Sequence, residues 1–180
     1  MLTIAKWSVE DYHKMIETGI LNDRPVELLE GTIIEMSPEG PLHRKKCDTV
    51  AEYLREKLKG YAKVYEAHPV TLSNSEPEPD IAIVRLPVSL YDTRHPYPED
   101  IYWLIEISDT TLTKDLEEKR LIYAKAGIRE YWVIEVEKKQ LRVFKDLAKY
   151  NYQQEQIYTK VEISPLAFPE IKLLVKNLVE

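Results

Sequence analysis

One glutamate lies inside a run of apolar residues, where a charged side chain needs a partner. Glu106 belongs to the segment IYWLIEIS, residues 101–108, in which nearly every neighbour is apolar. Burying an ionised carboxylate there is costly unless a cation or a hydrogen-bond network holds it. Strand alternation places Glu106 on one face with Leu104 and Ser108, near the carboxyl end where open α/β sheets tend to place their sites. The position fits a metal ligand, or a structural glutamate satisfied by the backbone or by an arginine.

Glu135 has almost the same local sequence, since WVIEV at residues 132–136 resembles WLIEI at residues 103–107. The residues downstream of each segment distinguish the two glutamates. Glu135 runs into EKKQ, which is typical of a hairpin turn, whereas Glu106 is succeeded by a loop and a predicted helix. Only Glu106 is therefore expected to receive a partner from a helix that returns over the sheet.

Lys119 is the strongest indication of a functional site in the sequence. It occupies a position that should be apolar in a stripe with spacings of 4, 3, 4 and 3, formed by Leu112, Leu116, Lys119, Tyr123 and Ala126. A lysine in such a stripe extends outward along its methylene groups, pairs with Asp115 one turn earlier, or meets a carboxylate beneath the helix. These alternatives differ in whether the ammonium group takes part in a site.

Asp80 follows Pro79 and opens the apolar run IAIV, residues 81–84. An aspartate at such a place is commonly a turn or cap residue. Here Asp80, Glu106 and Lys119 could converge on one edge of a sheet. Two carboxylates suit a hard cation such as Mg²⁺, which can activate a water for attack on phosphorus while an ammonium group steadies the developing charge.

The remaining candidates carry weaker signals. His43, near the start of a predicted helix, is either a cap or surface residue, or a phosphate contact or proton carrier at the same site. Glu27 and Glu30 flank a predicted hairpin turn and are expected to be exposed, although either could supply a further carboxylate. Cys47, in mid-helix, is expected to be buried and inert. His13, His68 and His95 share no spacing typical of a zinc site.

The elements that must position these residues are predicted from periodicity and from helix-stop and turn residues. A short helix is predicted over residues 8–17, and a hairpin over residues 26–29 and 32–36 with its turn at Glu30-Gly31. From residue 42 the predicted order is helix 42–59, strands 62–72, 80–84 and 101–108, helix 113–126 and strand 129–136. Residues 85–100 are expected to form a surface excursion, and further strands are expected after residue 140. The sequence thus predicts an α/β fold with a mixed sheet.

Composition limits the protein class. The 180 residues are 44% hydrophobic and 31% charged, which favours one globular domain over residues 1–180. A net charge of -6 argues against a constitutively basic surface, but a bound cation could still bring nucleic acid to the chain. With one cysteine and no long apolar run, the chain is expected to be soluble and cytoplasmic, with no disulfide framework and no membrane span.

Several motifs, in order along nearly the whole chain, resemble the Uma-type restriction endonuclease family within the PD-(D/E)XK nuclease superfamily. The motifs are SVEDYHKMIETG, ELLEG, MSPEGPLH, EPDIAIV, LIEISDTTLTKDLEEKRLIYAKAGIREYWVIE and SPLAFPEIKLLV. This resemblance implies a restriction-endonuclease-like αβββαβ core, preceded here by a helix and a hairpin and followed by extra strands.

The resemblance also implies roles for particular residues. Asp80 matches the aspartate of the PD motif, and Glu106 matches the acidic residue of (D/E)XK. Ser108 stands where the superfamily has its lysine, and Lys119 on the next helix matches the lysine of this family. His43 and Glu27 match family positions whose roles the sequence does not reveal.

The function implied is a Mg²⁺- or Mn²⁺-dependent endonuclease that cuts DNA, acting as a homodimer. In that reading Asp80 and Glu106 hold the ion, Lys119 orients the attacking water and His43 contacts a phosphate. The alternative is a non-catalytic dimeric module that binds nucleic acid or protein, favoured by the acidic composition and by Ser108. A hydrolase acting on another phosphodiester would use the same residues.

Overall fold

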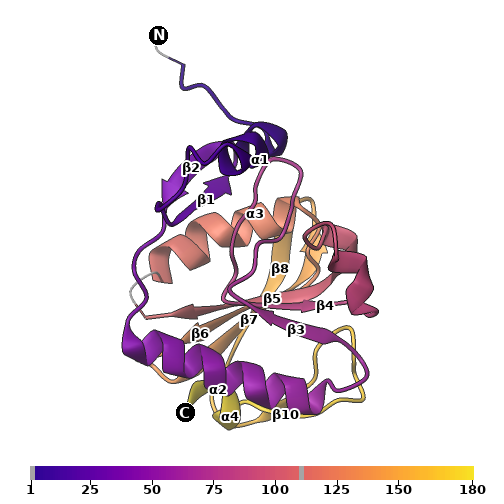
Figure 1. Ribbon diagram of the computed structural model, residues 1–180. Coiled ribbons are helices and arrows are strands. Elements are labelled where there is room, and N and C mark those ends of the chain that lie inside the picture. Colours follow the sequence, from indigo (N-terminus) through magenta and orange to yellow (C-terminus); the bar gives the residue numbers. More distant parts are fainter. Residues whose placement is uncertain (1–2, 110–111) are drawn as a thin grey trace.

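A six-stranded mixed sheet forms the centre of the fold, and helices cover both of its faces (Figure 1). The computed structural model describes residues 3–109 and 112–180. The spatial order is β3-β4-β5-β6-β7-β8; β5 and β6 run parallel and the other neighbours are antiparallel. The strands are β3 (Lys63–Glu66), β4 (Ile81–Val84), β5 (Ile101–Ser108), β6 (Tyr131–Glu135), β7 (Gln140–Ala148) and β8 (Asn151–Tyr158). The predicted αβββαβ core and mixed sheet are confirmed.

A helix and a hairpin precede this core. The first helix, α1 (Val9–Glu17), starts with a capping box between Ser8 and Asp11. The strands β1 (Val26–Leu29) and β2 (Thr32–Glu35) form a separate two-stranded sheet whose turn residues Glu30 and Gly31 have φ values of 45° and 74°. Gly31 also meets Lys6 and Trp7 so closely that a Cβ there would lie 2.9 Å from Lys6. The turn therefore favours glycine for both conformation and space.

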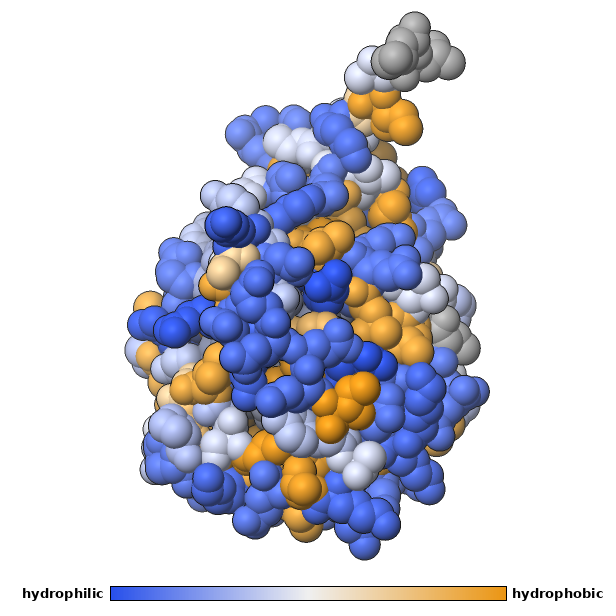
Figure 2. All heavy atoms as spheres, turned by 180° about the vertical axis from the view of Figure 1, so that it is seen from behind, coloured by the Kyte–Doolittle hydropathy of each residue, from blue (hydrophilic) through white to orange (hydrophobic). Residues whose placement is uncertain are grey.

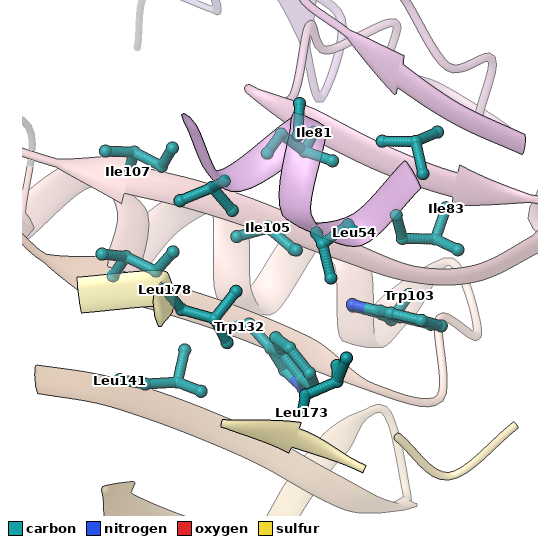
Figure 3. Close-up of a cluster of buried hydrophobic side chains, with 14 of the residues drawn as sticks. Leu54, Ile81, Ile83, Trp103, Ile105, Ile107, Trp132, Leu141, Leu173 and Leu178 are labelled. Carbon is teal, nitrogen blue, oxygen red and sulfur yellow. The ribbon is translucent and has the colours of Figure 1, made fainter. Parts of the chain in front are cut away.

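The helix α2 (Pro41–Lys57) covers one face of the sheet (Figure 1). Its buried residues Val50 and Leu54 pack against Ile81, Trp103 and other side chains from that face (Figure 3). The C-terminal segment completes this core with β10 (Leu173–Leu174), which pairs with β9 (Glu162–Ile163), and with α4 (Lys176–Val179). The strands expected after residue 140 are thus present, and the last ones are very short.

The opposite face is covered by one continuous helical stretch that corresponds to the helix predicted over residues 113–126. It comprises η3 (Lys114–Lys119), which has wide π turns, and α3 (Arg120–Lys125). Arg120 donates its backbone N–H to the Asp115 carbonyl five residues earlier, and that carbonyl also accepts a hydrogen bond from the Tyr131 hydroxyl. The extent of the helix was predicted correctly, but not its wide first turns, which depend on contacts with the sheet.

The strand predicted over residues 62–72 was wrong beyond residue 66. The chain leaves the sheet at Ala67, whose φ is 45°, and Pro69 cannot donate to a strand ladder. Val70 and Leu72 are nevertheless buried, so their apolar pattern reflects a packed loop. Residues 85–100 form the expected excursion, with the 3₁₀ turns η1 (Val88–Tyr91) and η2 (Pro98–Asp100).

The surface is mixed in character. From behind, Figure 2 shows hydrophilic side chains over most of the visible face, with apolar side chains in separate patches among them. None of the helices in the described part of the chain is both long and apolar enough to cross a membrane.

Candidate functional site

A pocket of about 640 Å³ opens where β5 ends, beside the segment that joins β2 to α2 at the left of Figure 1. Its wall includes His43, Asp80, Glu106 and Lys119. The four residues selected from the sequence lie in α2, just before β4, in the C-terminal half of β5 and in η3. The structure therefore brings all of them together in one concave place.

Asp80, the residue just before β4, is placed across from Glu106 by the antiparallel register of β4 and β5. The register pairs Ile81 with Ile105, so one further step along both strands sets Asp80 across from Glu106. Residues directly opposite in such a pair share a face, and their Cβ atoms are about 4.5–5.5 Å apart. The two carboxylates consequently enter the pocket side by side.

Asp80 is held from two directions through a single oxygen. Its Oδ2 accepts a hydrogen bond of 2.6 Å from the Ile107 backbone N–H and lies 3.2 Å from His43 Nε2. Within residues 3–109 and 112–180, no hydrogen bond is made to the other oxygen, Oδ1. Asp80 is thus fixed in place with one oxygen still available to a ligand.

Glu106, like Asp80, accepts hydrogen bonds through only one of its carboxylate oxygens among the described residues. Its Oε1 accepts hydrogen bonds from Lys119 Nζ at 2.9 Å and from the Tyr123 hydroxyl at 2.7 Å, while Oε2 has no hydrogen-bond partner in the described part of the chain. Tyr123 was expected only to pack in the helical stripe. Its place four residues after Lys119 on the same face was the signal that it would reach the same carboxylate.

Lys119 points beneath its helix and does not extend outward. The residue is 5% exposed, and its ammonium group pairs with Glu106 and, at 3.7 Å, with Glu27 Oε2. Burial disfavours the charged form, but the carboxylates of Glu106 and Glu27 outweigh it and raise the pKa of Lys119 above its usual value. Lys119 is therefore a cation at neutral pH.

Glu27 corrects an expectation, because it is 1% exposed and not a surface residue. All four residues of β1 are buried, since the hairpin lies between α1 on one side and the core on the other. Glu27 pairs with Lys114 and Lys119 and accepts the Glu78 backbone N–H at 3.2 Å. Glu30, at the turn, instead pairs with Lys125 at the surface.

Ser108 connects β5 to the start of the helical stretch that carries Lys119. Its hydroxyl donates a hydrogen bond of 2.5 Å to Asp115 Oδ2, and both residues are buried. Asp115 also lines the pocket. Ser108 thereby helps to place the helix that carries Lys119.

His43 and Cys47 lie one helical turn apart on α2. The hydrogen bond to Asp80 raises the pKa of His43 to about 9, so its imidazole is cationic at neutral pH. Cys47 is buried as expected, and its Sγ lies 3.6 Å from His43 Nδ1. Burial raises the pKa of this thiol well above its ordinary value.

Glu135 shows what the same strand sequence does without a returning lysine. It accepts hydrogen bonds from Lys138, Gln140 and Arg142 at the β6–β7 turn and does not line the pocket. The distinction that the downstream residues predicted between Glu106 and Glu135 is confirmed.

The pocket holds more negative than positive charge. Two lysines and one histidine face the eight carboxylates of Glu27, Glu35, Glu39, Glu78, Asp80, Glu106, Asp109 and Asp115. Burial, and then the charges of Asp80 and Asp115, raise the pKa of Glu106 although Lys119 opposes the shift. A cation in the pocket would relieve this imbalance.

This arrangement belongs to a family of nuclease-like proteins. Residues 9–176 match the Uma2 family, described as "Putative restriction endonuclease", and the chain belongs to that family. A solved structure of "a putative nuclease belonging to DUF820 from Anabaena variabilis ATCC 29413" has the same fold. It is 19% identical, with a TM-score of 0.66 over 85% of this chain and 88% of that one. No curated protein matches the chain.

Proposed function

We propose that this protein is a Mg²⁺- or Mn²⁺-dependent endonuclease that hydrolyses phosphodiester bonds in DNA. The observation that carries the proposal is the pairing of Asp80 and Glu106 across neighbouring strands, with Lys119 buried against Glu106 in one acidic pocket. Membership of a family described as restriction endonucleases supports the same reaction class.

The residues present fit a hard divalent cation. Asp80 and Glu106 each keep one oxygen without a hydrogen-bond partner among the described residues. Mg²⁺ prefers one or two carboxylates and retains several waters, so these two residues would hold it. When bound, the ion would neutralise phosphate charge and activate a water for attack on phosphorus.

Lys119 and His43 would supply positive charge at the site in addition to that of the metal ion. Lys119 makes one hydrogen bond with Glu106, which leaves N–H groups to orient a water beside that carboxylate. His43, a pocket residue whose pKa is raised to about 9, would contact a phosphate oxygen. Because the rest of the pocket wall is acidic, DNA should bind weakly to the protein when no metal is present.

We also propose that the protein forms a homodimer, which would present two such sites to the two DNA strands.

The test is a plasmid-cleavage assay on EDTA-treated protein with added Mg²⁺ or Mn²⁺. Asp80→Asn and Glu106→Gln should each lower cleavage at least about 100-fold, as expected when a principal catalytic group is lost. Glu135→Gln is the matched control, since it changes a buried glutamate of like sequence outside the pocket, and it should stay active. Cleavage that survives Asp80→Asn would overturn the assignment.

The second candidate is a non-catalytic dimeric module of the same fold that binds nucleic acid or protein. It is favoured by Ser108, which stands where the resemblance places the superfamily's lysine. The Ser108 hydroxyl already donates a hydrogen bond to Asp115. DNA binding that weakens steeply with salt, without cleavage under any metal condition, would select this candidate.

A further inference from the structure

Lys46 is a buried lysine of α2 whose charge has no partner. The residue is 8% exposed, and within residues 3–109 and 112–180 its ammonium group makes neither a hydrogen bond nor an ion pair. The charge of Glu180 acts on Lys46, but Glu180 pairs with Lys176. Lysines are almost never buried unless they are paired. Because Lys46 Nζ is not fully enclosed, an anion from outside the chain can reach it.

Two further lysines, Lys45 and Lys139, make the surroundings of Lys46 positive. Burial, and then the charge of Lys139, lower the pKa of Lys46, and the charge of Lys45 acts in the same direction. Both of these side chains are exposed, and neither forms an ion pair in the part of the chain that the structure describes. We call Lys45, Lys46 and Lys139 the lysine cluster. Since like charges in one place repel each other, a bound anion would stabilise all three.

The lysine cluster lies beside the candidate pocket. The strands β5 and β6 run parallel with Ser108 across from Glu135, so the turn that carries Lys139 leaves β6 at the same edge of the sheet where β5 ends at the pocket. Lys46 follows the pocket residue His43 by three positions on α2, which places both on one side of the helix, about 4.5 Å apart along its axis. Figure 1 shows the first turns of α2 next to this edge of the sheet.

We propose that the lysine cluster binds backbone phosphates of double-stranded DNA next to the phosphate that enters the pocket. This inference rests on the proposed nuclease function and adds the path of the substrate. Successive phosphates of one strand advance about 3.4 Å along the duplex axis, a step similar to that from His43 to Lys46. A strand that runs along α2 with one phosphate at His43 therefore brings a neighbouring phosphate to Lys46. Contacts of this kind fix the position of the DNA and read no bases, so the cluster binds without sequence preference.

The test is the salt dependence of DNA binding, measured by fluorescence anisotropy of a short labelled duplex. Ca²⁺ replaces Mg²⁺, so that a cation neutralises the acidic pocket without supporting the Mg²⁺-dependent reaction. Each phosphate contact that is lost should reduce the slope of log K against log salt by about 0.9. Lys46→Gln and Lys139→Gln should each show this reduction and bind roughly fivefold to tenfold more weakly near 0.1 M salt. Because Lys139 is exposed, its variant tests the surface even if Lys46→Gln folds poorly.

Lys57→Gln is the matched control. It removes the same charge from an exposed lysine at the other end of α2, roughly 16 Å beyond Lys46 along the helix. This variant should keep the salt slope of the wild type and bind DNA within about twofold of it. A wild type that does not bind the duplex, or a slope unchanged in both Lys46→Gln and Lys139→Gln, would overturn the DNA-binding role of the lysine cluster. Binding that depends on the cluster, without cleavage in Mg²⁺, would support this surface and reject only the nuclease activity.

Discussion

Lys119 lies beneath its helix because its position in an otherwise apolar stripe leaves it little other direction, and two carboxylates from distant parts of the chain hold its charge. Neither Glu106 on β5 nor Glu27 on the N-terminal hairpin is its neighbour in sequence. A lysine in this setting is poorly placed to serve stability, since a buried ion pair is seldom a large net gain. A role in the proposed reaction explains the burial of Lys119 better than a contribution to stability does.

Lys119→Met should abolish metal-dependent cleavage while the protein still folds. The methionine side chain fits the apolar position, and Glu106 retains the hydrogen bond from Tyr123. Glu106 can also take up a proton, because burial already raises its pKa and the loss of Lys119 removes the charge that opposes this shift. The free energy of unfolding should therefore fall by roughly 1–3 kcal/mol, less than the 3–5 kcal/mol typical of a broken buried pair. Plasmid cleavage and urea unfolding measure the two effects.

The control for this variant is Lys125→Met, on the same helix. Lys125 pairs with Glu30 at the surface and its side chain is 55% exposed. This change should leave both cleavage and unfolding nearly as in the wild type. If Lys119→Met cut plasmid as fast as Lys125→Met, the proposed role of Lys119 would be wrong.

The sequence identified those site residues whose type conflicts with their local pattern. Glu106 was found because it interrupts an apolar run, and Lys119 because it interrupts an apolar helical stripe. Asp80 was found because it directly precedes the apolar run at residues 81–84. Glu27 was named as a possible further carboxylate, but its burial was not predicted, since that burial depends on how a short hairpin packs between α1 and the core. Nothing in a four-residue strand predicts that both of its faces will be covered.

At the scale of elements, the β6–β7 hairpin is stabilised by a charged network around Glu135. Burial acts to raise the pKa of this carboxyl, but hydrogen bonds from Lys138, Gln140 and Arg142 hold it below its usual value. Because the pKa is lower in the folded state, the network stabilises the protein above the ordinary pKa of 4.5. This contribution is lost as the pH falls through the lowered value.

Glu135→Gln should therefore lower the free energy of unfolding by about 1.5–3 kcal/mol at pH 7, the size of a lost hydrogen bond to a charged group. The difference from the wild type should shrink as the pH falls below about 4.5. Urea unfolding at a series of pH values measures it. Glu155→Gln, which changes the exposed carboxylate on the other side of Arg142, should show a much smaller effect. A difference that grows in acid would contradict this account.

Elements with a clear period or clear end residues were predicted well, and those shaped by tertiary contacts were not. Periodicity and turn residues predicted the helices α1 and α2, the β1–β2 hairpin and the two central parallel strands β5 and β6. The end of β3 was missed because Val70 and Leu72 continue an apolar pattern in a loop that packs against the sheet. The wide turns of η3 depend on a tyrosine hydroxyl from β6, which no local pattern contains.

At the scale of the whole molecule, negative charge is concentrated in the pocket as well as in the total of -6. A ligand that binds only the folded state raises stability by RT ln(1 + [L]/Kd), about 2.7 kcal/mol at 100 times Kd. Mg²⁺ should thus raise the Tm of EDTA-treated protein by several degrees. The shift should vanish in Asp80→Asn and persist in Glu135→Gln. An equal shift in Asp80→Asn would place the ion elsewhere.

The pairing of Glu27 with Lys114 and Lys119 joins the N-terminal hairpin to the central sheet through the site itself. Any local opening that lifts the hairpin away must break both ion pairs of Glu27 and expose the buried residues of β1, which makes such opening rare. The backbone amides of Val26–Leu29 should then exchange with deuterium at rates set by events in the pocket. Deuterium uptake by these amides therefore reports whether the ion pairs of Glu27 are intact, even when no reaction is taking place.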